Sequence, residues 1–262
     1  MNDDAIVLSK EEGIATITLN RPDSLNSLTP DGICKLSQMT RELKNDDEVK
    51  VVILTGAGRG FCAGFDLSEI ASGGYDQQRF VKLMSFLNEI PLNLREMPKP
   101  TIAMVNGVAA GVGCNLCLAC DIIIASEKAR FGEVFVRTAG VHPDGGGSYF
   151  LPHLVGIHRA CELLFTGKVI SASEADRIGM INRVVPHEQL ESNVKELALD
   201  ITKVAPIPLR MLKTSIYKAL GTDLSTALEA ETRAQAVCFF TEDAKEAARA
   251  FAEKRQPEFK GK

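Results

Sequence analysis

Residues Thr101-Ile-Ala-Met-Val-Asn-Gly-Val-Ala-Ala-Gly-Val-Gly-Cys-Asn115 join an apolar run to a glycine-rich turn. The run over 101–105 predicts a buried strand, and the glycines from Gly107 to Gly113 predict a turn that enters a helix. Glycine lets a bound molecule approach the main chain, and the first N–H groups of a helix have no intrahelical acceptor. We therefore predict an oxyanion hole built from backbone amides at this turn.

Further apolar runs at 5–9, 14–19, 51–55 and 121–125 predict strands, the first two as a hairpin. Amphipathic segments lie between and after them, and the pattern is mostly helical from residue 159 onward. The predicted helices span 29–43, 80–95, 160–165, 172–178, 190–204, 208–220, 224–240 and 244–251. Short strands that alternate with amphipathic helices indicate an α/β fold. We predict a boundary near residue 200, between a mixed core (1–200) and a helical end (201–262).

Length and charge limit the possible functions. The 262 residues are 45% hydrophobic and carry a formal net charge of −4, which fits one large domain and gives no electrostatic footprint for nucleic acid or an anionic membrane. No apolar run approaches the roughly 20 residues that span a bilayer. The acidic start Met1-Asn-Asp-Asp4 is unlike a secretory signal, so we expect a cytoplasmic protein with a small-molecule partner.

Two motifs that resemble cofactor sites do not meet the requirements of those sites. Cys114, Cys117 and Cys120 lack the fourth ligand and the following proline of an iron–sulfur pattern, so we expect them to pack in the core with the other four cysteines. The turn Thr55-Gly-Ala-Gly-Arg-Gly60 lacks the lysine of a phosphate-binding loop and the acidic residue of a dinucleotide fingerprint. The histidines show no metal spacing. We therefore expect no metal and no separate cofactor.

Val141-His-Pro-Asp-Gly-Gly-Gly147 places one acid in a second glycine-rich turn. We predict that Asp144 is the acid that works with the oxyanion hole; the alternative is that it only caps a helix starting at Gly145. His142 could tune or replace this acid. An apolar pocket is expected to raise the pKa of Asp144. Its predicted members are Phe135, Val136, Phe150 and Leu151.

Several separated motifs together resemble the enoyl-CoA hydratase/isomerase (crotonase) family in order and spacing. They include Arg21-Pro-Asp-Ser-Leu-Asn-Ser27, Gly60-Phe-Cys-Ala-Gly-Phe-Asp-Leu67, Gly111-Val-Gly-Cys-Asn115 and Gly179-Met-Ile-Asn-Arg-Val184. The resemblance covers nearly the whole chain. It implies a spiral of ββα units, a C-terminal region that forms homotrimers or dimers of trimers, and acyl-CoA thioester substrates of fatty acid metabolism. Coenzyme A is then part of the substrate.

The resemblance also implies roles for individual residues. By position, the backbone N–H groups of Phe65 and Val112 hold the thioester oxygen. Most family members have glycine at the second position, so the Val112 side chain must point away from the acyl group or narrow the pocket. The residues expected to contact coenzyme A are Ser24, Leu25, Ala63, Gly64, Asp66 and Leu67.

The resemblance favours an isomerase over a hydratase (a lyase). Family hydratases carry two glutamates, whereas this chain has Asn115 at the first position and Phe135-Val136 around the second. An amide cannot serve as a general base at neutral pH. Asp144 matches the single acid of isomerases similar to Δ3,Δ2-enoyl-CoA isomerase and 1,2-epoxyphenylacetyl-CoA isomerase. We therefore expect double-bond isomerisation with one acid.

Two alternatives stay open. The segment between Phe131 and Pro143 is one residue longer than the usual family spacing, around Thr138-Ala139, and this could rotate Glu133 inward as a second acid of a hydratase. The chain could also be a non-catalytic acyl-CoA-binding protein, in which case replacing Asp144 would change no turnover. Asn115, Glu133 and His142 are therefore the possible auxiliary residues.

Overall fold

The structure, a computed structural model, describes residues 4–66, 68 and 76–262. In this part of the chain the larger sheet has six strands in the order β1-β2-β3-β5-β7-β10. β1 is antiparallel to β2, and the other neighbours are parallel. The strands are β1 (Ile6–Glu11), β2 (Ile14–Leu19), β3 (Val51–Gly56), β5 (Thr101–Val105), β7 (Ile122–Ser126) and β10 (Arg183–Val185).

A second sheet has four short strands in the order β4-β6-β8-β9. They are β4 (Gly60–Cys62), β6 (Val108–Ala110), β8 (Arg130–Gly132) and β9 (Val169–Ser171). β4, β6 and β8 follow β3, β5 and β7 in the chain, so the chain passes repeatedly from the large sheet to the small one before a helical segment. This is the spiral of ββα units that the sequence analysis predicted, and it confirms the fold class.

The helices lie close to their predicted ranges. Thr29 rather than Asp31 caps the first one, because its Oγ1 accepts a hydrogen bond from the Gly32 N–H at 3.1 Å. The helices of the body are α1 (Pro30–Lys44), α3 (Gln77–Glu96), α4 (Val112–Ala119), α5 (Gly147–Val155), α6 (Ile157–Thr166), α7 (Ala172–Arg177) and α8 (Leu190–Thr202). None of the helices in the described ranges is long and apolar enough to cross a membrane.

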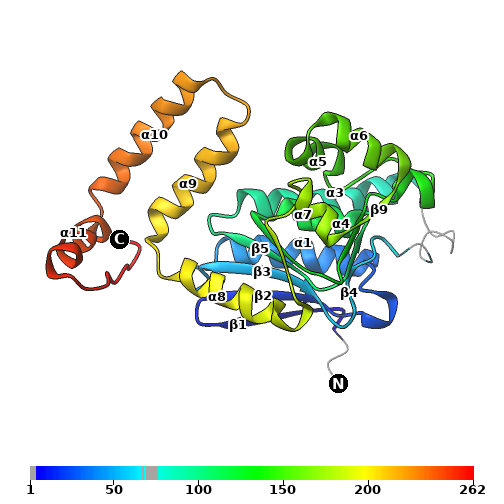
Figure 1. Ribbon diagram of the computed structural model, residues 1–262, viewed down its shortest axis with the longest axis horizontal. Coiled ribbons are helices and arrows are strands. Elements are labelled where there is room, and N and C mark those ends of the chain that lie inside the picture. Colours follow the sequence, from blue (N-terminus) through cyan, green and yellow to red (C-terminus); the bar gives the residue numbers. More distant parts are fainter. Residues whose placement is uncertain (1–3, 67, 69–75) are drawn as a thin grey trace.

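The large sheet is covered by helices on both faces, and Figure 1 shows α1 and α3 opposite α8. Along β3, Val52 and Leu54 belong to the core cluster that includes α1 and α3, whereas Val51 and Ile53 pack with residues of α8. This alternation follows from the two-residue period of a strand. Both faces of the sheet are therefore packed against helices, and the turns at its strand ends are attached to this packed layer.

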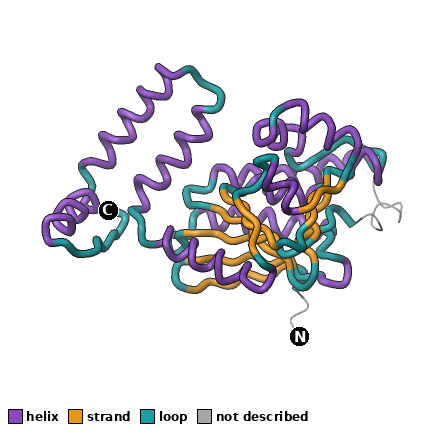
Figure 2. Tube along the Cα trace, viewed as in Figure 1, coloured by secondary structure: helices purple, strands orange, loops and turns teal. Residues whose placement is uncertain are grey.

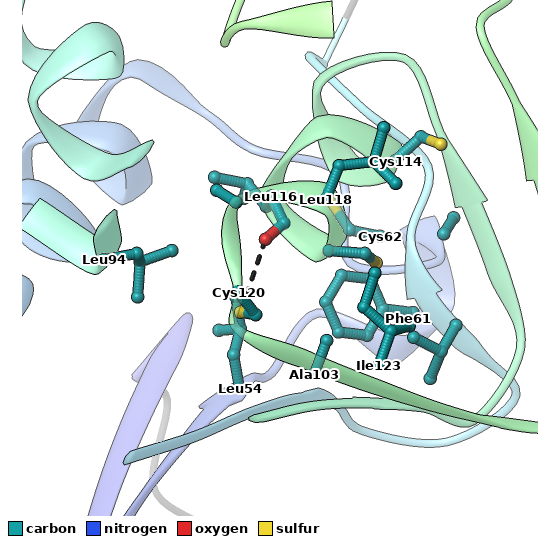
Figure 3. Packing of buried hydrophobic residues seen from close by; sticks show 14 of the residues in the cluster. Leu54, Phe61, Cys62, Leu94, Ala103, Cys114, Leu116, Leu118, Cys120 and Ile123 are labelled. Atoms are coloured by element: carbon teal, nitrogen blue, oxygen red, sulfur yellow. Dashed lines mark hydrogen bonds between the residues drawn. The ribbon is translucent and has the colours of Figure 1, made fainter. Parts of the chain in front are cut away.

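The three cysteines along α4 and at its C-terminal end are packing residues, as predicted. Cys114, Cys117 and Cys120 are free thiols and are fully or almost fully buried. Figure 3 shows Cys114 and Cys120 among leucines of the core. The thiols of Cys117 and Cys120 donate to the carbonyl oxygens four residues earlier, at 3.4 and 3.5 Å. Burial raises the pKa of Cys120 to about 12. Such thiols are inert at neutral pH.

The last three helices, α9 (Pro206–Ala219), α10 (Leu224–Phe239) and α11 (Glu242–Glu253), extend away from the body as an arm (Figures 1 and 2). The arm is fixed at its base by Lys213, whose ammonium group lies 2.7 Å from Asp121 and donates to two backbone carbonyl oxygens. Tyr217 donates to the other oxygen of Asp121 at 2.6 Å. The arm begins at Pro206, and the boundary near residue 200 stays a prediction.

Candidate active site

Two glycine turns meet main chain to main chain, one after β4 and one at the start of α4. Gly64 has a φ of +103°, and a Cβ added there would lie 3.0 Å from the carbonyl oxygen of Ala110. A Cβ on Gly113 would overlap the carbonyl oxygen of Cys62. The two glycines therefore let the turns lie closer together than residues with side chains would allow. This contact brings the two predicted oxyanion amides to one place.

The amides themselves are oriented by their neighbours. Leu28 donates to the carbonyl oxygen of Gly64 at 2.8 Å, and its own carbonyl accepts from the Asp66 N–H at 2.9 Å. Because successive N–H groups of an extended chain point to opposite sides, the Phe65 N–H points away from Leu28. Val112 is the first residue of α4 and lacks an intrahelical acceptor. Within the described residues neither amide has a hydrogen-bond acceptor.

The Val112 side chain is buried in the core. Only 1% of it is exposed, and its Cγ2 lies 3.0 Å from the point where a Cβ on Gly145 would sit. The ring of Phe135 packs 3.6 Å from the corresponding point on Gly111. Val112 therefore fills space that Gly145 leaves empty, next to the loop that carries Asp144.

Asp144 lies in the loop before α5 and is partly buried, with its Oδ1 buried and unpaired within the described chain. Burial raises the pKa of this carboxyl to about 6, although its own N–H and the charge of His142 lower it. The capping alternative is wrong: α5 begins at Gly147, its N-cap is Gly146, and no side chain caps it. The carboxyl is thus available for chemistry at a pKa near neutrality.

Asn115 and Glu133 lie next to this loop. The Asn115 side chain is fully buried, and its Nδ2 donates to the backbone oxygen of Asp144 at 2.7 Å. A Cβ on Gly147 would lie 2.9 Å from Oε2 of Glu133 and 2.7 to 2.8 Å from the amide atoms of Asn115. Glu133 follows β8 and is 2% exposed. The structure therefore gathers Asn115, Glu133 and Asp144 around the glycine run.

Burial also raises the pKa of Glu133, to about 7. The side chains of Cys114 and Asn115 lower this pKa in part, and the charge of Asp144 raises it further. Neither oxygen of Glu133 has a hydrogen-bond partner among the described residues. Two carboxyl groups with raised pKa values thus lie in one small region, which is typical of a functional site.

The segment with the predicted extra residue forms a π-helical turn over Phe135–Ala139. A π turn holds more residues than an α turn and is frequent at functional sites. His142 is exposed, and its Nδ1 lies 2.6 Å from the backbone oxygen of Pro143. The His142 ring is therefore turned to its own main chain at the surface, and the Asp144 carboxyl is the more buried group of this loop.

Three of the four residues of the predicted apolar pocket are buried. Phe135, Phe150 and Leu151 are buried, with at most 8% exposure, whereas Val136 is 44% exposed. Val136 faces solvent because the π turn carries it outward from the body. The ring of Phe150 lies against Gly146, and the Arg95 guanidinium lies 4.7 Å from its centroid. An apolar wall therefore does lie behind the loop of Asp144.

The predicted coenzyme A residues that the structure describes lie on two neighbouring segments, Ser24-Leu25 and Ala63 to Asp66. The Ala63 N–H donates to the carbonyl oxygen of Leu25 at 2.9 Å, which joins the segment of Ser24 to the loop of Gly64. Asp66 accepts hydrogen bonds from Ser68 and Arg21, and these lower its pKa to about 2. Leu67 lies outside the described residues. The role of these segments in binding coenzyme A stays a prediction.

Two residues of the site were missed as individuals. Asn26 is 1% exposed and donates to the carbonyl oxygens of Ala57 and Gly60, so it holds the loop before β4 in place. Gly147 leaves the space in which Asn115 and Glu133 meet. The run of three glycines after Asp144 was the available signal, because three adjacent residues without side chains leave room for neighbouring groups.

Comparisons with known proteins agree with this geometry. The family model for enoyl-CoA hydratase/isomerase matches residues 9–262. A short-chain-enoyl-CoA hydratase of Clostridium acetobutylicum is 41% identical over 97% of this chain and 96% of its own length. A 1,2-epoxyphenylacetyl-CoA isomerase of Escherichia coli is 37% identical, covering 96% and 97%. The crystal structure of an enoyl-CoA hydratase from Bacillus anthracis superimposes with a TM-score of 0.94 at 37% identity, over 99% of this chain and 100% of that one. The chain belongs to the enoyl-CoA hydratase/isomerase family.

Proposed function

We propose that this member of the family is an enoyl-CoA double-bond isomerase, of the Δ3,Δ2 type or similar to 1,2-epoxyphenylacetyl-CoA isomerase. The observation that carries the proposal is the pair of side chains at the site. Asp144 is a partly buried carboxyl whose pKa is about 6, and Asn115, which cannot act as a base, holds the Asp144 main chain. One carboxyl that both takes and returns the proton, beside two free amides, is enough for isomerisation.

The proposed reaction moves one proton within the substrate. The Asp144 carboxylate removes a proton from C2 of a 3-enoyl thioester, and the electron pair passes to the thioester oxygen, giving a dienolate. The amides of Phe65 and Val112 stabilise this oxyanion, each by about 3 to 4 kcal/mol. Asp144 then returns the proton to C4, and the double bond lies between C2 and C3. The proton and electrons balance without a further cofactor, with coenzyme A as part of the substrate.

The pKa of Asp144 suits both halves of this reaction. A general base works best when its pKa is near the working pH, because it must be ionised to take the proton and acidic enough to return it. The value of about 6 is close to that optimum, whereas an exposed aspartate at 3.8 is a weaker base. Such catalysis contributes a factor of about 10² to 10⁴ in rate.

Hydration is the second candidate, and two observations favour it. Glu133 is a buried carboxyl close to Asp144, and the Clostridium acetobutylicum relative at 41% identity is a short-chain-enoyl-CoA hydratase. Two carboxyl groups are what hydration of a 2-enoyl thioester requires. We favour isomerisation because Asn115 occupies the position at which a hydratase carries its first glutamate.

Mass analysis of the products separates these candidates. Purified protein is incubated in deuterated water with a 3-enoyl-CoA and, separately, with its 2-enoyl isomer. Interconversion of the two without added water supports the isomerase. A product heavier by one water from the 2-enoyl substrate supports the hydratase, and binding without any conversion supports a non-catalytic acyl-CoA-binding protein.

We also propose that the C-terminal arm is covered by further copies of the chain, as homotrimers or dimers of trimers. Large apolar side chains on the arm are strongly exposed in a single chain, including Leu212, Leu224, Phe239, Phe240 and Phe251. Leu212, Phe239 and Phe240 line one hollow between α9 and α10, and contiguous exposed apolar surface marks interaction sites. Light scattering is expected to give a multiple of the 28.4 kDa chain mass, and a monomer at micromolar concentration would contradict the proposal.

A further inference from the structure

The polar groups around Gly147 are short of hydrogen-bond partners. In the described residues, six buried side-chain atoms have none, and four of these belong to this one site. They are Oδ1 of Asn115, both carboxyl oxygens of Glu133 and Oδ1 of Asp144. A buried polar group without a partner is costly, so native proteins rarely contain one without a reason. All four atoms are acceptors as long as both carboxyl groups are ionised, so protonation of one carboxyl would supply a donor among them.

The orientation of Asn115 shows where that donor is needed. A backbone carbonyl can only accept, so the nitrogen of the Asn115 amide must face the carbonyl oxygen of Asp144, 2.7 Å away. Oδ1 is then directed elsewhere and requires a donor of its own. Oδ1 of Asn115 and Oε2 of Glu133 both lie within 2.9 Å of the point where a Cβ on Gly147 would be. A neutral carboxyl on Glu133 carries the O–H group that this oxygen lacks.

The surroundings of Glu133 favour that neutral form. Burial is the largest influence and disfavours its charged form, and the charge of Asp144 in the loop before α5 acts in the same direction, whereas Cys114 and Asn115 of α4 favour the charged form in part. Lys168 borders the same small cavity, whose other walls are mostly apolar. Glu133 makes no ion pair with Lys168 or with any other described cation. The apolar residues lining this cavity are Phe131, Leu151, Leu163, Ile170 and Met180.

We propose that Glu133 is a positioning residue that donates a hydrogen bond from its protonated carboxyl to Asn115, which in turn holds the main chain of Asp144. The proposal rests on the proposed function for its effect on catalysis, and it assigns to Glu133 no contact with substrate. Loss of the proton removes the donor and places a second negative charge near Asp144. Turnover is therefore expected to need Glu133 protonated and Asp144 ionised.

The test compares two substitutions of Glu133 across pH 5 to 9. Glu133→Gln keeps an N–H donor that does not titrate, and Glu133→Met has a similar length without a donor. In the unmodified protein, kcat is expected to fall as the pH rises above about 7, the pKa of Glu133. Glu133→Gln is expected to keep its activity through this range, and Glu133→Met to lose about tenfold in kcat at every pH, with little change in KM.

A spectroscopic measurement does not depend on turnover. The infrared difference between the unmodified protein and Glu133→Gln at pH 6 is expected to show the carbonyl band of a protonated carboxylic acid, which is lost at pH 9. Absence of this band at pH 6, or equal impairment of the Gln and Met variants with an unchanged pH profile, overturns the proposal. If no enoyl-CoA is isomerised, the proposed function fails, and the band alone still decides the protonation of Glu133.

Discussion

Replacing Asp144 with asparagine is expected to remove most of the turnover and yet make the folded protein more stable. The activity falls because an amide cannot carry the proton, and the loss expected for a general base is about 10²- to 10⁴-fold in kcat. The stability rises because folding places an ionised carboxyl in a poorly solvated site, which raises its pKa from 3.8 to about 6. At about 1.4 kcal/mol per pKa unit this is a cost of about 3 kcal/mol, which partial exposure reduces to about 1 to 3.

The sign of the pH dependence makes this prediction specific. The folded pKa is raised, so the cost is fully present above pH 6 and disappears below the ordinary value of 3.8, where the group is protonated in both states. Urea unfolding of Asp144→Asn is therefore expected to show its gain at pH 8 and to lose most of it at pH 4.5. Turnover of a 3-enoyl-CoA is measured on the same preparations. A variant that is less stable at pH 8, or that keeps its turnover, would refute the reasoning.

Two further substitutions test the scaffold of the site. Gly113→Ala is expected to push α4 away from the Cys62 carbonyl, which lowers kcat and lowers stability by about 1 to 3 kcal/mol. Gly221→Ala is the control, because open space surrounds Gly221, and it is expected to change neither quantity. Equal thermal unfolding of the two variants would contradict this. Lys213→Met is expected to lower the free energy of unfolding by about 3 to 5 kcal/mol, because it leaves the largely buried Asp121 carboxylate without its cation. Adding Asp121→Asn should recover part of that loss in denaturant unfolding. If the losses of the two substitutions simply add, this explanation is wrong.

The long elements of the fold could be predicted because their patterns are local. The strand at Thr101–Val105 is a continuous apolar run, and the helix Pro30–Lys44 has a capping threonine and an amphipathic period. The three-residue strands of the second sheet, such as Gly60–Cys62 and Val108–Ala110, could not be predicted in the same way. They contain glycine and alanine, and they become strands only through pairing with segments distant in the sequence.

The site was predictable in its single residues more than in their arrangement. Asp144 was recognisable as the acid in a glycine-rich turn, and the raised pKa follows from its burial. The position of Glu133 stayed open, because it depends on how the π turn over Phe135–Ala139 directs the chain. The contact of Asn115 with the Asp144 main chain joins two elements 29 residues apart. No local pattern encodes such a contact.

The path of the transferred proton tests the central claim most directly. A 3-enoyl-CoA with deuterium at C2 is incubated with the protein in ordinary water, and the 2-enoyl product is analysed by NMR for deuterium at C4. Transfer by the one carboxyl of Asp144 predicts deuterium at C4 during a single turnover. An isomerised product with hydrogen alone at C4 would mean that the proton reaching C4 comes from water and not from C2, and it would contradict direct transfer by Asp144, as would a hydrated product.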